Sequence, residues 1–200
     1  MSSTGAEPPS EVEPGTQAGP DRSVARLRVV AHPVRLDMLS LLTGASLSAT
    51  EVARELRITQ ANASYHLRRL LDAGLLVVDG QVKVNGGTAK KYRHPWEELL
   101  AQEGSASRAH PSDVPEADRV AQVTTLAQAV PRRFVRRVPG DTSGHFTDID
   151  TWVDPEVWAQ AVALVAEASR LMHAHACAPR ALGTVRASLS VAAFRLEDQR

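Results

Sequence analysis

The chain has 200 residues, 43% of them hydrophobic, and its 23 basic and 23 acidic side chains leave no formal net charge at pH 7. This apolar content excludes a wholly disordered chain and allows one large or two small domains with buried cores. Because Cys177 is the only cysteine, an intrachain disulfide is excluded. The longest uncharged apolar-rich stretch, residues 157–166, is too short to cross a membrane, so we expect a soluble protein of the reducing cytoplasm.

Residues 1–20 predict a disordered tail, because they are rich in Pro, Gly, Ser and Glu and lack the basic start and apolar core of a signal peptide. Two scaffold helices are expected next. Leu27 and Val30 give the first helix an inward face, and Pro33 fits the first turn of the second, which ends near Gly44. The second helix supplies further core residues, namely Val34, Met38, Leu39 and Leu42.

Residues 49–73 predict two helices joined by a tight turn, the arrangement that places a second helix in the DNA major groove. Val52 and Leu56 form the apolar face of the first helix, and Ala53 is small where the helices cross. Ile58 fills the turn, and Thr59 is a good N-cap for a second helix over residues 60–73. The apolar side of that helix consists of Ala63, Leu67, Leu70 and Leu71. Its outer side has short, hydrogen-bonding or cationic side chains: Ala61, Asn62, Tyr65, Arg68 and Arg69, with Ser64 at the edge.

An ordinary amphipathic helical hairpin with a solvated outer face is the structural alternative, and the residues that follow argue against it. Residues 75–84 predict a strand, 85–87 read Asn-Gly-Gly and predict a turn, and 90–93 return as a second strand. This hairpin, over residues 79–94, carries the basic side chains Lys83, Lys90, Lys91 and Arg93, which suit the sugar–phosphate backbone beside an occupied groove. A helix-turn-helix followed by a basic hairpin indicates a winged helix.

These residues resemble the ArsR-type winged-helix transcriptional regulators over roughly residues 23–94. The resemblance is carried by Ala31-His32-Pro33-Val34-Arg35-Leu36 with Leu39 and Leu42, by Ser64-Tyr65-His66-Leu67 with Leu70, and by Ala73-Gly74-Leu75. It implies a cytoplasmic homodimer that binds a palindromic operator and usually represses transcription. The metal-sensing branch of the family has a Cys-x-Cys pair where residues 51–57 contain no cysteine, so metal sensing is not implied.

The zero net charge is distributed unevenly along the chain. Residues 21–96 have a formal charge of +6, whereas residues 1–20 and residues 97–200 each have −3. The positive charge therefore lies where the winged helix is predicted, as a phosphate-binding module requires.

Residues 97–114 are assigned to a linker, with a short helix over 96–102 at its start and a remainder rich in Ser, Gly and Pro. A helix is expected to begin at Pro115 and to break or kink at Pro131. Its apolar residues at helical spacing are Val120, Val123, Ala127 and Val130. The arginines at 132, 133, 136 and 137 allow an anion contact, although a solvated helix face is the favoured interpretation.

Residues 115–200 are interpreted as a small α+β domain for dimerisation, which is also the candidate sensor of an unknown small-molecule effector. Residues 145–153 and 185–191 predict strands, the second by clean alternation. Between them, a helix from Asp154-Pro155 to Cys177 has an unusually wide apolar surface. One stripe comprises Trp158, Ala161, Val162, Val165 and Met172, and Val157, Leu164, Ala168 and Leu171 broaden it. We expect Trp158, Val162 and Val165 to meet a second subunit.

Other chemistry is weakly indicated. His173, His175 and Cys177 suggest a metal site, but only His173 and Cys177 can share a helix face and no acidic cluster adjoins them, so no metal and no cofactor is predicted. His66 lies at the border of the buried helix face, where a structural hydrogen bond is expected rather than base reading. No phosphate loop, catalytic triad or carboxylate pair is evident, so the protein is not expected to be an enzyme.

The sequence thus predicts a dimeric, sequence-specific DNA-binding regulator, with the helix over 60–73 in the major groove and the wing over 79–94 on the backbone. Base and nearby phosphate contacts are assigned to Gln60, Asn62, Ser64, Tyr65 and Arg68. Backbone contacts are assigned to Thr59, Lys83, Lys90, Lys91 and Arg93. The alternative is a winged helix used for protein–protein assembly, which should expose apolar groups on the same face.

Overall fold

The computed structural model describes residues 20–84, 86–105 and 115–197, so the predicted tail over 1–20, apart from Pro20, and the linker residues 106–114 lie outside the described residues. Helices α1 (Pro20–Val30) and α2 (Pro33–Thr43) are the predicted scaffold pair. Pro33 opens α2 at its first turn, and the backbone N–H of Val34 donates to His32 Nδ1 over 3.2 Å, which makes His32 the N-cap.

The helix-turn-helix consists of α3 (Ala49–Leu56) and α4 (Gln60–Asp72), as predicted. A capping box begins α3: the Ser48 N–H donates to Glu51 Oε2 over 2.7 Å, and the Glu51 N–H donates to the Ser48 hydroxyl over 3.3 Å. The hydrogen bonds from the Ser48 backbone and hydroxyl hold the pKa of Glu51 below its usual value. The core under these helices joins α2, α3 and α4 and contains Met38, Leu39, Leu42, Val52, Ala53, Ala63, Leu67, Leu70, Leu75 and Leu76.

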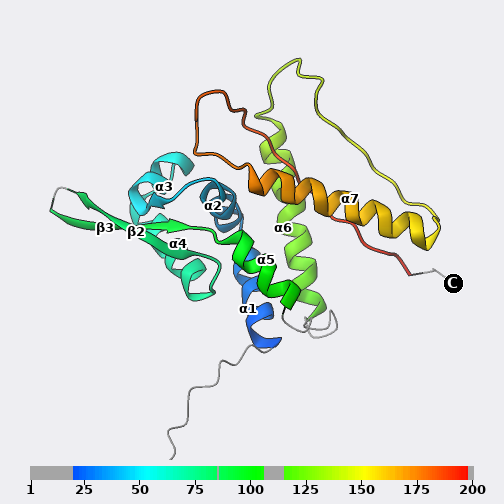
Figure 1. The fold of residues 1–200 in the computed structure, drawn as a ribbon, viewed down its shortest axis with the longest axis horizontal. Coiled ribbons are helices and arrows are strands. Elements are labelled where there is room, and N and C mark those ends of the chain that lie inside the picture. The colour runs from blue at the N-terminus through cyan, green and yellow to red at the C-terminus, as the bar shows by residue number, and fades with distance from the viewer. Residues whose placement is uncertain (1–19, 85, 106–114, 198–200) are drawn as a thin grey trace, which may run out of the picture.

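A three-stranded antiparallel sheet follows in the order β1-β3-β2, with β1 at Leu47–Ser48, β2 at Val77–Val84 and β3 at Gly87–Arg93. The β2–β3 hairpin projects away from the helices (Figure 1) and confirms the predicted wing. Its register shifts between Val78 and Gly80, so Asp79 is the extra residue of a β-bulge. Gly80 has a φ of 142°, which a residue with a Cβ rarely adopts.

Helix α5 (Trp96–Ser105) leaves the sheet, and α6 (Glu116–Phe134) packs against α1 and α2. Arg28 of α1 is ion-paired with Asp118 over 2.9 Å, and Arg133 near the end of α6 with Asp37 over 3.0 Å. The small residues Thr125 and Ala129 are the buried residues of α6, because they allow close approach to its neighbours. The predicted apolar stripe at 120, 123, 127 and 130 is instead exposed.

Of the two expected effects of Pro131, a break or a kink, the break does not occur, since α6 continues to Phe134. Pro131 lies in the last turn, where it removes one backbone donor while its own carbonyl still accepts from the Val135 N–H over 3.1 Å. The other arginines of this end make local contacts: Arg132 donates to the Gln128 carbonyl and Arg137 lies over the Phe134 ring. This agrees with the interpretation of a solvated helix face.

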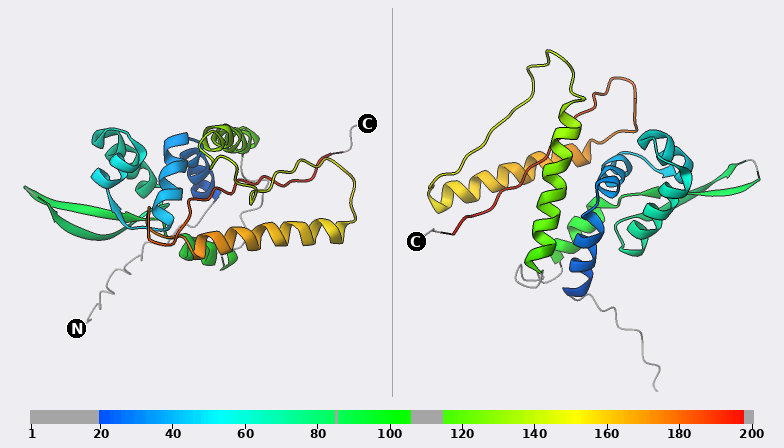
Figure 2. Two further views of the ribbon diagram at one scale, coloured as in Figure 1. Left: turned by 90° about the horizontal axis from the view of Figure 1, so that it is seen from above. Right: turned by 180° about the vertical axis from the view of Figure 1, so that it is seen from behind.

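The long helix of the C-terminal part, α7, spans Pro155–Ala174, close to its predicted extent, with Asp154 as N-cap. The two predicted strands are absent: residues 143–154 and 185–197 have no strand pairing in the described part of the chain. A strand requires a neighbouring strand to pair its N–H and C=O groups, and alternation in sequence does not supply that neighbour. Figure 2 shows α7 and α6 crossing at different levels. No helix of the described residues is both long and apolar enough for a membrane span.

Candidate nucleic-acid interface

The turn between α3 and α4 fixes how the second helix is presented. Arg57 ends α3 in the left-handed conformation, with a φ of 56°, and the Ile58 N–H returns to the Ala53 carbonyl over 3.0 Å. Thr59 then caps α4, because its hydroxyl accepts from the Asn62 N–H over 3.2 Å. A tight turn with both helix ends satisfied holds the start of α4 rigidly at the surface.

Helix α4 has one buried and one exposed face, as predicted. Ala63, His66, Leu67 and Leu70 are its buried residues. The exposed face contains the predicted contact residues Gln60, Asn62, Tyr65 and Arg68, and Ser64 is half-buried at its edge. The Arg68 guanidinium donates to the Ser64 carbonyl over 3.3 Å, so Arg68 lies folded along the helix rather than extended. The structure therefore brings the five residues assigned to base and nearby phosphate contacts onto one continuous helix side.

His66 differs from the predicted hydrogen-bonded histidine. It is 6% exposed, and its Nδ1 has no hydrogen-bond partner among the described residues. Its ring lies instead 4.6 Å from that of His32 and 5.1 Å from that of Tyr65, measured between centroids. Burial, followed by the charges of His32 and Arg35, lowers the pKa of His66. Helix α4 thus packs on the His32 ring through His66, and Tyr65 connects this aromatic contact to the exposed face of the helix.

The wing presents its basic residues on two opposite faces. Directly paired residues of neighbouring strands share a face, and successive residues of one strand alternate between faces. Because Lys83 pairs with Thr88 and Lys90 with Gln81, Lys83 and Lys90 lie on one face, whereas Lys91 lies on the other. Lys83 and Lys90 are exposed, and Lys91 is half-buried.

Arg93 is ion-paired with acidic groups at the base of the wing, and Lys91 lies near a third acidic group. The Arg93 guanidinium lies 3.0 Å from Glu98 of α5 and 3.4 Å from Asp79 in the bulge. The hydrogen bond to Glu98, supported by Asp79, raises the pKa of Arg93. Lys91 faces Ser48 across the β1–β3 pair, and its charge contributes to the lowered pKa of Glu51. Both residues thus have a structural role, in contrast to Lys83 and Lys90.

Two exposed arginines adjoin the predicted contact residues without having been assigned to the interface. Arg57 lies in the turn directly before α4, and Arg69 lies on the outer side of α4 itself. Arg69 is close enough to Arg35 for its charge, together with burial, to lower the pKa of Arg35. The signal for Arg57 was available in the sequence, because a cation in the turn of a helix-turn-helix lies near the groove edge.

Comparison with known families finds a match to a helix-turn-helix domain at residues 30–79, which covers α2, α3, α4 and the start of β2. A search of curated proteins finds no match to the chain. The matched region includes the whole exposed face of α4 and excludes most of the wing and all of α5, α6 and α7. A helix-turn-helix domain indicates DNA binding and, with it, regulation of transcription.

Proposed function

We propose that the protein is a sequence-specific transcriptional regulator that binds a palindromic operator as a homodimer and represses the adjoining gene. The observation that carries this proposal is the exposed polar face of α4, held by a capped turn and flanked by the lysines of the wing. A helix presented in this way fits the major groove, where amide, hydroxyl and guanidinium groups can distinguish base pairs.

The contact residues divide by chemistry. Gln60, Asn62 and Arg68 supply hydrogen bonds to base edges, with Ser64 and Tyr65 at the margin of the groove. Thr59 and the wing lysines serve the phosphates. Among the wing residues, Lys83 and Lys90 are the stronger candidates, because Arg93 is already ion-paired with acidic groups of the protein and Lys91 is half-buried on the opposite face.

The proposal is tested by selecting duplexes from a randomised pool with the full-length protein. We expect enrichment of an inverted repeat whose half-sites are about one helical turn apart, or a multiple of it. Asn62→Ala should weaken binding to the enriched site by roughly 1–3 kcal/mol and leave binding to random duplex almost unchanged. A pool without a shared sequence after selection contradicts operator binding and favours an assembly module.

A further inference from the structure

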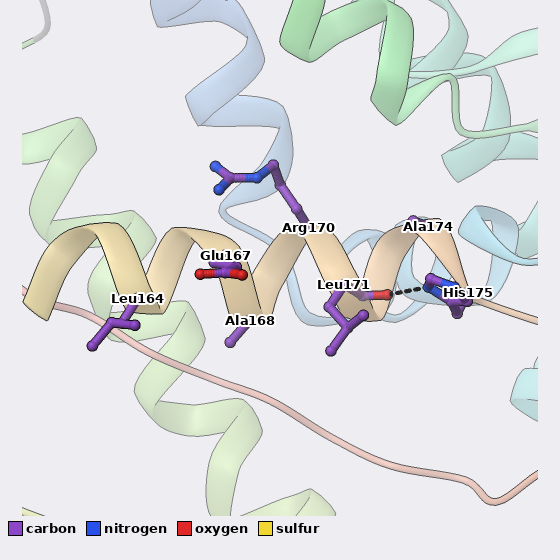
Figure 3. Close-up of a pocket in the computed structure, with 7 residues that line it drawn as sticks. All are labelled: Leu164, Glu167, Ala168, Arg170, Leu171, Ala174 and His175. Atoms are coloured by element: carbon purple, nitrogen blue, oxygen red, sulfur yellow. Dashed lines mark hydrogen bonds between the residues drawn. The ribbon is translucent and has the colours of Figure 1, made fainter.

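Helix α7 has a straight apolar seam that nothing in the described chain covers. The seam consists of Val157, Ala161, Leu164, Ala168 and Leu171, whose spacing alternates between four and three residues. Val157, Leu164 and Leu171 are 52%, 59% and 61% exposed. Figure 3 shows Leu164, Ala168 and Leu171 pointing to the same side of the helix, while Arg170 points away from it. This spacing is that of a helix–helix seam.

The seam is distinct from the face by which α7 meets its own chain. The half-buried residues of α7 include Trp158, Val165 and Ser169, which together are centred about 100° round the helix from the centre of the seam. His173 lies 5.3 Å from the Trp96 ring of α5, between centroids. Beyond the helix, Arg180 is ion-paired with Glu55 of α3 over 2.7 Å. The helix is thus anchored at its C-terminal end, with its seam directed elsewhere.

We propose that a second copy of this chain covers the seam, with the two α7 helices antiparallel across a two-fold axis. This inference rests on the dimer of the proposed function and names its surface. Large and small side chains alternate along the seam, so in an antiparallel copy each layer between Val157 and Ala168 pairs a large side chain with an alanine. Leu164 lies against the partner's Ala161, and Val157 lies against the partner's Ala168. Because a two-fold interface uses the same patch twice, a self-complementary seam identifies a second copy as the occupant.

The flanks of the seam support the same pairing. In this register Gln160 lies beside the partner's Glu167 on one flank, so no like charges oppose each other. A shift by one heptad would bring Glu167 against its own copy. Antiparallel pairing also orients the dipoles of the two helices favourably.

The anchor of α7 gives this dimer a consequence for DNA. Gly44 at the end of α2 lies so close to the backbone of Cys177 that an added Cβ would approach the Cys177 oxygen to 2.5 Å. Because Arg180 is ion-paired with Glu55 of α3, the segment that directly follows α7 contacts both α2 and α3. A dimer axis on α7 therefore fixes the separation of the two α4 helices, on which half-site spacing depends.

Sedimentation velocity of the full-length protein, without DNA, tests the inference. The wild type should sediment as a dimer, Leu164→Glu as a folded monomer, and the matched control Leu182→Glu, at a fully exposed loop position, as a dimer. Leu164→Glu should bind the palindrome roughly 10²-fold more weakly and a single half-site as well as the wild type does. A monomeric wild type, a dimeric Leu164→Glu or a monomeric control overturns the proposal.

The register has its own test. Ala161→Glu and Leu164→Lys should each dissociate the dimer, and the double variant should restore it, because the introduced carboxylate and ammonium would face each other across the seam. A double variant that stays monomeric contradicts the antiparallel register. The sedimentation measurements contain no DNA, so a failure of operator binding in the wild type affects the proposed function alone and leaves the seam result standing.

Discussion

At the scale of single residues, α4 packs against the rest of the winged helix through a contact between two histidines, His66 and His32. The pKa values of His32 and His66 are both lowered, chiefly by burial, and Arg35 adds an unfavourable charge to each. Burial also lowers the pKa of His94, whose Nδ1 lies 2.7 Å from the Leu75 carbonyl oxygen. Protonating any of them places a charge in or beside the core of the winged helix.

The stability of the winged helix should therefore decrease in mild acid. Because the folded-state pKa of these histidines lies below the unfolded value, the unfolded chain binds more protons below about pH 6.5. The histidines contribute their full stabilisation above that pH. This stabilisation is lost as the pH falls from the unfolded-state pKa to the folded-state pKa. Urea unfolding at a series of pH values from 8 to 5 measures this, and His66→Leu should flatten the dependence. Equal slopes for wild type and variant would remove His66 from the explanation.

The exposed side of α4 could be predicted from sequence, because helical periodicity alone separates Asn62, Tyr65 and Arg68 from the buried residues. The roles of Lys91 and Arg93 could not be predicted. They depend on the bulge at Asp79 and on the position of Glu98 in the next helix, which only strand register and tertiary packing determine. For His66, the sequence indicated burial but not the ring of His32 as its neighbour.

At the scale of elements, the wing is a two-faced hairpin and not a uniformly basic surface. Only one face of a flat ribbon can lie against a duplex, so Lys83 and Lys90 should act together. Lys83→Ala with Lys90→Ala should reduce the log–log salt slope of DNA binding by about two units, near one per lost phosphate contact. Lys91→Ala is the matched control and should change the slope little. If Lys91→Ala has the larger effect, the opposite face of the wing meets the DNA.

The elements after the wing show which structures the spacing of apolar residues can predict and which it cannot. Helices α6 and α7 were predicted from spacing and capping, because a helix satisfies its own backbone. Helical spacing did not show which face of α6 is buried, since packing selected the small Thr125 and Ala129 and left the valines exposed. The predicted strands at 145–153 and 185–191 do not form, because each strand needs a neighbouring strand for its backbone hydrogen bonds.

At the scale of the whole molecule, the C-terminal part is attached to the DNA-binding head at several points. Helix α6 is ion-paired to α1 and α2, and the end of α7 lies against Gly44, Glu55 and Trp96. The division into separate domains over 21–96 and 115–200 stays a prediction. These contacts mean that a movement of α7 can be transmitted to α2 and α3, as effector sensing requires.

Gly44→Ala tests this attachment. Its Cβ would overlap the Cys177 carbonyl, and because the obstacle is backbone, the segment over 176–180 must move away. We expect a lower melting temperature and faster amide hydrogen exchange in residues 173–180. Gly144→Ala is the control, since no atom lies within 4 Å of its added Cβ. Unchanged exchange in Gly44→Ala would show that the contact does not hold α7 in place.

The central claim is that α4 reads DNA with the wing beside it. The most direct test is a titration of the isotopically labelled protein with its selected duplex, followed by amide chemical shifts in NMR. If α4 and the wing contact DNA, the largest shifts should occur at residues 57–69 and around Lys83 and Lys90, with smaller shifts in the α7 seam. Shifts concentrated in α6 and α7, with α4 unaffected, would contradict it.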